Sequence, residues 1–226
     1  MVVILFILTV AGCIAVDVYL RRRERLRMAA ESPALGAPAR IIPYLTAHEL
    51  PRGLFVHSGH TWAKLEPSGE VQVGLDGFAR DVLGKVDRFD LPAAGAQVRQ
   101  GEPVIAALQS GKRIEFVSPV DGVVCAVNDA INADPQGAKN EPYVKGWALA
   151  IRPSNLVQNI KKLRIGADAS EWLEKEVRSF AEFLTLHRAV PQGVGVTLPD
   201  GGTYAEGIME TMDGEILQIV IRKYFR

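Results

Sequence analysis

Few side chains of this sequence have the type and spacing that chemistry requires. His57 and His60 could begin a metal site, but no cysteine or carboxylate at ligand spacing completes it. Gly111 and Lys112 lack the preceding glycine and the following serine or threonine of a phosphate-binding loop. The chain contains neither a GxSxG segment nor a paired cysteine and histidine nucleophile. The sequence therefore predicts no catalytic residue and no metal site, and we expect a non-catalytic module or carrier.

The cysteines and two of the tryptophans are expected to be structural. Cys13 lies in an apolar segment at the start of the chain, far from Cys125, so no disulfide is predicted. Cys125 belongs to the strand-like run GVVCAV, where a thiol is more often buried and inert than reactive. Trp62 and Trp147 occupy strand-like positions, where large aromatic side chains usually form core.

The composition is that of a chain with an ordinary globular core. Of the 226 residues, 48% are hydrophobic and 23% are charged, which excludes a disordered protein. The 26 lysines and arginines balance 26 aspartates and glutamates. Because this balance gives no broad positive field, nucleic acid is not expected as a partner.

The start of the chain has the pattern of a membrane anchor. Residues 2–20 are apolar except for Asp17, and as a helix they would nearly span a hydrocarbon core of about 30 Å. Five arginines follow between Arg21 and Arg27, the reverse of the order in a cleaved signal peptide. Such clusters stay on the cytoplasmic side. We therefore predict a single-pass protein of the plasma (inner) membrane, with residues 2–20 in the lipid bilayer and the soluble part cytoplasmic; the alternative is a buried helix.

The remaining chain divides into a linker and a β-rich unit, followed by a tail. Residues 1–27 are the predicted transmembrane helix and its basic flank, and residues 28–53 form a linker with four prolines. Residues 54–154 contain short β-rich runs separated by Gly, Pro, Asp and Asn, a pattern typical of a small barrel or sandwich. One helix is expected at Asp76–Leu83, where the aspartate can cap its start.

Residues 155–226 are predicted to form a small α+β appendix. Asp168 and Glu171 have capping-box spacing at the start of a helix. An apolar stripe along this helix must pack on something, and its members are Leu173, Val177, Phe180 and Leu184. Beyond the helix, turn signals at Pro199–Gly202 and Asp213-Gly214 separate three runs that we expect to be strands, namely GVGVTL, TYAEGIME and ILQIVIRKYF.

An ordered set of short motifs within residues 54–154 resembles the H protein of the glycine cleavage system. Any one motif is weak evidence, but their order and spacing agree with that family from His60 to Trp147. The motifs are His60-Thr61-Trp62, Val73-Gly74-Leu75, Ala79, Leu83-Gly84, Asp90-Leu91-Pro92, Gly95, Gly101-Glu102, Ser118-Pro119-Val120-Asp121-Gly122, Val127-Asn128, Glu141-Pro142-Tyr143 and Gly146-Trp147. The N-terminal segments and the tail have no counterpart in this resemblance.

The resemblance implies a mainly β, lipoyl-domain-like fold, the barrel-sandwich hybrid, to which this chain adds a transmembrane helix and an α+β appendix. In the family, a hairpin turn displays a lysine that carries lipoate, and this arm shuttles an aminomethyl group and reducing equivalents between the enzymes of glycine cleavage. Such an arm needs an exposed hairpin tip. Turn signals at Gly101-Glu102 and Asp121-Gly122 place the tip midway, at Gln109–Lys112.

The chain departs from the family at the attachment motif. The family's E-S-V-K-A falls on Leu108-Gln109-Ser110-Gly111-Lys112, so Gly111 stands at the lysine position and the preceding acidic residue is replaced by Leu108 or Gln109. We therefore expect no cofactor, and we interpret the chain as a membrane-tethered binding or scaffold subunit with protein partners in a membrane complex. The alternative is a carrier with lipoate on Lys112, which requires a one-residue slip that brings Lys112 to the tip.

Overall fold

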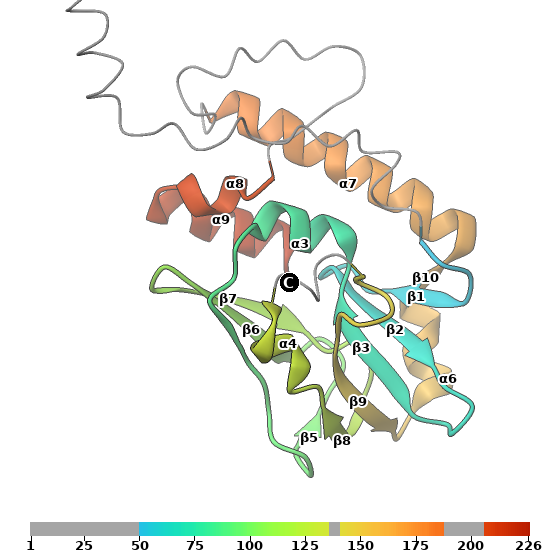
Figure 1. Ribbon diagram of the computed structural model, residues 1–226. Helices are drawn as coiled ribbons and strands as arrows, with labels where there is room; N and C mark the ends of the chain where they lie inside the picture. The colour runs from blue at the N-terminus through green and yellow to red at the C-terminus, as the bar shows by residue number, and fades with distance from the viewer. Residues whose placement is uncertain (1–49, 136–140, 188–205) are drawn as a thin grey trace, which may run out of the picture. The chain divides into compact units, whose positions relative to one another are not determined.

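The computed structural model describes residues 50–135, 141–187 and 206–226, and these residues are built around two antiparallel sheets (Figure 1). The larger sheet has the strand order β10 (Arg164–Ile165), β1 (Leu54–Val56), β2 (Thr61–Leu65), β3 (Val71–Leu75), β9 (Trp147–Pro153), β8 (Gly122–Val127) and β5 (Gln97–Val98). The smaller sheet has the order β4 (Arg88–Asp90), β6 (Pro103–Gln109) and β7 (Lys112–Val117). The expected mainly β architecture is confirmed.

The helix expected at Asp76–Leu83 is also confirmed. Helix α3 covers Gly77–Leu83, and the side chain of Asp76 accepts a hydrogen bond from the backbone N–H of Ala79 at 2.9 Å. This contact satisfies one of the N–H groups that a helix start leaves unpaired. Further short helices connect the strands: α4 (Ala130–Ala133), α6 (Leu156–Asn159) and the 3₁₀ turn η1 (Ile160–Lys162).

The long tail helix is present, but its predicted start was wrong. Helix α7 covers Gly166–Leu186, and the whole expected stripe is buried: Leu173, Val177, Phe180 and Leu184. Ile165 precedes the helix and makes no side-chain cap. Asp168 therefore lies in the first turn, where its charge suits the helix dipole, and the expected capping box with Glu171 does not form.

The end of the chain is helical, so the predicted β-structure of the appendix was wrong there. Helix α8 covers Ile208–Thr211 and includes the last residues of the run TYAEGIME. Helix α9 covers Gly214–Tyr224 and includes most of the run ILQIVIRKYF. We had expected both runs to be strands. Asp213 does not start a hairpin turn; its side chain accepts from the N–H of Ile216 at 2.9 Å and caps α9. The buried residues of α9 recur at helical spacing: they are Leu217, Val220, Ile221 and Tyr224. The run GVGVTL lies outside the described residues.

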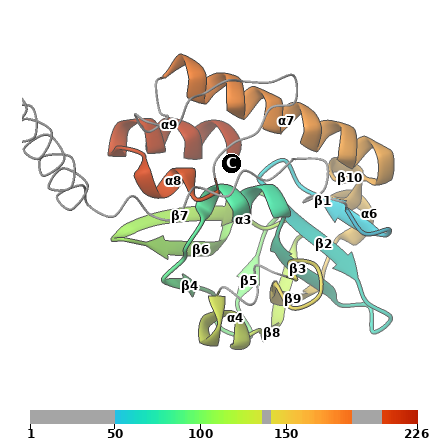
Figure 2. The same cartoon turned by 45° about the horizontal axis from the view of Figure 1, so that its top comes forward.

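The tail helices share one hydrophobic core with the sheets. Both views show α3, α7, α8 and α9 together on one side of the strands (Figures 1 and 2). Phe225, which follows α9, is fully buried, and its ring lies 5.2 Å from that of Phe116 in β7 and 5.4 Å from that of His60. The buried side chains of α7, α8 and α9 therefore belong to the same core as the sheets.

The predicted transmembrane helix and almost all of the linker lie outside the described residues. Among the helices that are described, none combines the length and the hydropathy that a membrane crossing requires. The anchor therefore stays a prediction from the sequence.

We predict that Phe180→Ala lowers the free energy of unfolding by about 3–5 kcal/mol, because the side chain is fully buried and its loss leaves a cavity. The matched control is Leu186→Ala in the same helix, since that side chain is 80% exposed and its loss should change little. Urea unfolding of the full chain measures both. Equal stability of the two variants would mean that α7 does not pack on the sheets.

Candidate functional site

The tip of the hairpin lies within the predicted segment Gln109–Lys112. Strands β6 and β7 are joined by Ser110 and Gly111, with Gln109 paired to Lys112. Both turn residues have positive φ angles, 48° for Ser110 and 77° for Gly111, which is the signature of a type I′ turn. Gly111 is exposed, and a Cβ atom at this position would meet nothing within 4 Å. The tip is therefore open to solvent, and the residue at the family's lysine position has no side chain.

Lys112 does not project from the tip. Its ammonium group contacts the end of α8, where it donates to the carbonyl oxygens of Met212 at 2.8 Å, Glu210 at 3.2 Å and Met209 at 3.4 Å. The last carbonyls of a helix have no partner within the helix and carry partial negative charge. An ammonium has three N–H donors, so Lys112 can satisfy all three oxygens. Lys112 thus caps α8 across about a hundred residues of sequence.

The register of the hairpin explains this direction. Side chains alternate between the two faces of a strand, so Lys112 shares a face with Ile114 and Phe116, which are both buried in the core. Arg113 and Glu115 point to the opposite, solvent-facing side. The slip that would bring Lys112 to the tip is absent from this pairing, because Ser110 and Gly111 occupy the turn.

A second set of contacts joins the hairpin and α8 to the end of α3 and to the turn that follows it. The side-chain amide of Gln109 is buried and donates to the carbonyls of Leu83 and Lys85, the latter at 2.7 Å. From the tail, the carboxylate of Glu210 accepts from the N–H of Lys85 at 2.6 Å. The N–H of Gly207 donates to the carbonyl of Asp81 at 2.7 Å. Gln109, one of the two residues that replace the family's acidic residue, therefore has a structural role.

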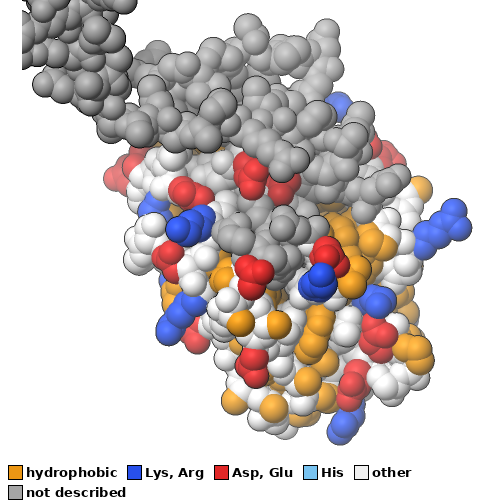
Figure 3. Space-filling view, viewed as in Figure 1, with side chains coloured by type: hydrophobic (Ala, Val, Ile, Leu, Met, Phe, Trp, Pro, Cys, Tyr) orange, Lys and Arg blue, Asp and Glu red, His pale blue; other side chains and the backbone are white. Residues whose placement is uncertain are grey.

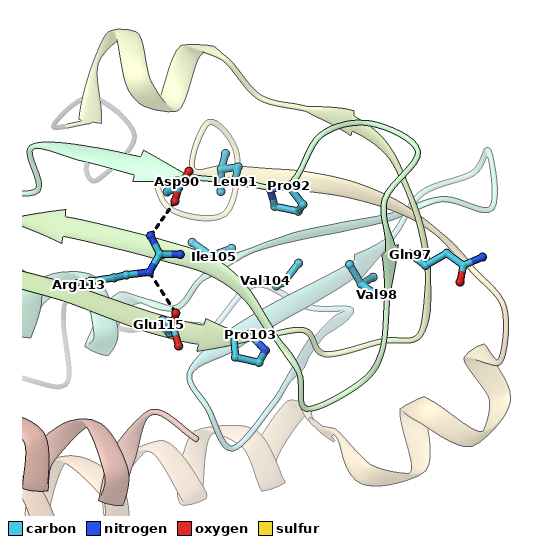
Figure 4. A pocket seen from close by; sticks show the side chains of 11 residues that line it. Asp90, Leu91, Pro92, Gln97, Val98, Pro103, Val104, Ile105, Arg113 and Glu115 are labelled. Carbon is cyan, nitrogen blue, oxygen red and sulfur yellow. Dashed lines mark hydrogen bonds and ion pairs between the residues drawn. The ribbon is translucent and has the colours of Figure 1, made fainter.

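On the outer face of the hairpin, an arginine is held between two carboxylates (Figure 4). Arg113 donates to Asp90 at 2.7 Å and to Glu115 at 3.1 Å. The hydrogen bond from Arg113 lowers the pKa of Asp90. The three side chains border a surface hollow of about 310 Å³ whose lining includes Val98 and Val104. The lining of the hollow thus combines this charged network with apolar side chains.

The two histidines have separate structural partners. The Nδ1 atom of His57 accepts from the N–H of Gly59 at 3.0 Å. Burial lowers the pKa of His57 to about 4, and the nearby charge of Arg164 acts in the same direction. His60 is fully buried, and its Nδ1 atom lies 2.8 Å from a carboxylate oxygen of Asp76. In the described part of the chain, no group of three potential metal ligands comes together.

The tryptophan and cysteine expectations are only partly met. Trp62 is fully buried, and its indole N–H donates to the carbonyl of Leu75 at 3.0 Å, as expected for core. Trp147 is half-buried at the start of β9. The burial predicted for Cys125 was wrong, because the pairing of β8 shifts register between Val124 and Ala126 and leaves Cys125 half-exposed. Cys13 lies outside the described residues.

Known proteins match the β-rich part of this chain. A profile of the family "Glycine cleavage H-protein" matches residues 54–176. The probable glycine cleavage system H protein of Thermococcus gammatolerans is 32% identical over 128 residues, which cover 56% of this chain and 94% of that protein. The glycine cleavage system H protein of Methylococcus capsulatus is 37% identical over 108 residues, 47% of this chain and 84% of that protein. A crystal structure of a glycine cleavage system H protein from Mycobacterium marinum matches with a TM-score of 0.46 and 25% identity, over 56% of this chain and 98% of that one. The profile ends within α7, so α8 and α9 lie beyond it.

We predict that His57 makes the protein less stable in mild acid. Between the usual histidine pKa of about 6.5 and the folded-state value of about 4, the unfolded chain binds a proton that the folded chain does not. The free energy of unfolding should therefore fall as the pH falls through this window. His57→Asn keeps an acceptor for the Gly59 N–H but does not titrate, so its stability should depend less on pH. Urea unfolding at about pH 7 and about pH 4.5 gives the change in the free energy of unfolding for the wild-type chain and for the variant. An equal change in both would mean that His57 does not cause the loss of stability in acid.

Proposed function

Because this chain belongs to the glycine cleavage H-protein family, we propose that it is a member whose hairpin does not carry lipoate and that it acts as a protein-binding module. The observation that carries the proposal is the contact between the Lys112 ammonium and the three carbonyls at the end of α8. The carriers of this family are not themselves catalysts, and family membership therefore supports a non-catalytic role.

The hairpin does not fit the lipoyl group. A lysine that carries lipoate needs a free amine at the tip, but Gly111 offers none and the amine of Lys112 is directed onto α8. Acylation would replace the ammonium by a neutral amide with a single N–H donor. At least two of the three carbonyls at the helix end would then lose their partner, and the attached chain would have to pass through the position of α8. Modification of Lys112 would therefore have to displace the tail.

The surface supports a protein partner better than a nucleic acid. On the face shown in Figure 3, lysines and arginines are interspersed with aspartates and glutamates and with hydrophobic side chains. A nucleic-acid site would need one extended positive patch. We propose that the partner belongs to a membrane complex, because the apolar residues 2–20 and the following arginines would hold the domain at the cytoplasmic side of the inner membrane.

The second candidate function is a lipoylated carrier with lipoate on Lys112. Family membership favours it, and Lys112 directly follows the exposed turn. In this case α8 would have to leave the hairpin before modification and whenever the arm enters a partner enzyme.

We predict that protein purified from its native membranes has no lipoyl group. Intact mass and the tryptic region from Gln109 to Arg113 measure this directly. Two variants distinguish a lysine with a structural role from a lysine that carries lipoate. Lys112→Arg keeps a cation for the α8 carbonyls and should preserve stability and function, whereas Lys112→Ala should lower the free energy of unfolding by about 1–2 kcal/mol. Lipoate on a substantial fraction of Lys112 would establish the carrier function instead.

We also predict the orientation in the membrane. A reporter enzyme that works only in the cytoplasm should be active when it is fused to the carboxyl end. The reason is that the arginines between Arg21 and Arg27 follow the apolar run and stay on the cytoplasmic side. The control moves these arginines to the other end of the run, which should invert the signal. Periplasmic activity of the unaltered fusion would overturn the proposed topology.

A further inference from the structure

Strand β7 is the outermost strand of the three-stranded sheet, and part of its backbone faces away from the sheet. Because the hairpin turn has two residues, Gln109 and Lys112 form a hydrogen-bonded pair, and such pairs alternate along an antiparallel ladder. The backbone N–H and C=O groups of Lys112, Ile114 and Phe116 therefore face β6. Those of Arg113 and Glu115 face outward.

The other edge of this sheet is closed. On β4, the side chain of Asn132 accepts from the N–H of Phe89 at 2.7 Å and donates to its carbonyl at 2.9 Å, so one amide takes the place of a neighbouring strand. The edge strands of the larger sheet, β10 and β5, have only two residues each. Proteins protect sheet edges by such devices because an open edge pairs with other chains.

The edge of β7 is closed only at its far end. There, the hydroxyl of Thr61 donates to the carbonyl of Val117 at 2.9 Å. Among the described residues, no hydrogen bond uses the outward N–H or the outward C=O of Arg113 or Glu115. The tail helices lie against the core face of the hairpin, since they contact Lys112 and Phe116. They leave the outer face of the strand to solvent, where Arg113 is 50% and Glu115 38% exposed.

We propose that β7 is an interface between two copies of this chain, which pair antiparallel about a two-fold axis at Ile114. In this register Arg113 stands opposite Glu115 of the second copy, and Glu115 stands opposite Arg113. Both are residues with outward backbone groups, so each of the two pairs exchanges an N–H···O bond in both directions. The two three-stranded sheets become one six-stranded sheet. This inference is independent of the proposed function, because it uses the edge of the hairpin and not its tip.

The charges of the strand select a second copy over an unrelated strand. A two-fold axis makes the interface self-complementary, so every contact occurs twice. Within one copy Arg113 already donates to Asp90 and Glu115 on the outer face. Because Arg113 and Glu115 lie two residues apart on this face, the antiparallel register adds Glu115 of the second copy directly across from Arg113, twice per interface. Shifting the register by two residues would place Arg113 opposite Arg113 or Glu115 opposite Glu115, which is repulsive. The sequence Arg-Ile-Glu thus specifies both the partner and the register.

The test measures the mass of the full-length protein in detergent by light scattering and sedimentation. The wild-type chain should be a dimer. Arg113→Glu and Glu115→Arg should each raise the dimer dissociation constant by about tenfold or more, because each places like charges opposite one another twice. An equimolar mixture of these two variants should regain the dimer, since every pair in the mixed dimer is again of opposite charge.

Glu115→Pro tests the backbone contribution separately. It removes an outward N–H that β6 does not use, so the fold should persist while the dimer is lost. Circular dichroism checks that each variant is folded. If the proline variant does not fold, the mixing experiment with the two charge variants tests the proposal. A monomeric wild-type chain would overturn the proposal. So would a dimer that none of the substitutions weakens, or a mixture that does not recover it.

Discussion

The two-residue turn of the β6–β7 hairpin determines which side chains of β7 face the core and which face solvent. With Ser110 and Gly111 in the turn, the ladder pairs Gln109 with Lys112 and fixes the direction of every side chain that follows. Lys112, Ile114 and Phe116 go to the core face, and Arg113 and Glu115 go to solvent. A shift of one residue would exchange the two sets and would place charged side chains in the core. The direction of Lys112 is therefore tied to the burial of Ile114 and Phe116.

The tail and the β-fold stabilise each other through the contacts that this direction allows. Helix α8 has four residues, too few to be stable by itself. Its end is held by Lys112, and Glu210 holds the backbone of Lys85. In return, the tail fills the core with Phe225 against Phe116 and His60. The family profile ends in α7, so this packing involves a part of the chain that the family match does not include.

The β-core could be predicted from the sequence because its signals are local. Turn residues separated the strands, Asp76 marked a helix start, and the apolar stripe of α7 repeated at helical spacing. The sequence of α9 was wrongly predicted to be a strand because it is rich in Ile and Val, which favour strands. In addition, a buried strand and a buried helix segment can both appear as apolar runs. Asp213-Gly214 fits both a hairpin turn and a helix cap, and here the aspartate caps. Lys112 caps α8 across about a hundred positions of sequence, and no local pattern in the sequence predicts such a contact.

The strands of the hairpin and the residues of its turn are specified by different constraints. The strands on either side of the turn are specified by buried residues such as Ile114, and these do not depend on what the tip displays. At the tip, Gly111 has a φ of 77°, a conformation that glycine adopts at lower cost than residues with a side chain. A lysine at this position would therefore favour a different turn. Glycine permits the tight type I′ turn, this turn directs Lys112 toward α8, and the amine becomes a structural contact. The position of Gly111 in the turn and the contact between Lys112 and the end of α8 thus both follow from the register of this hairpin.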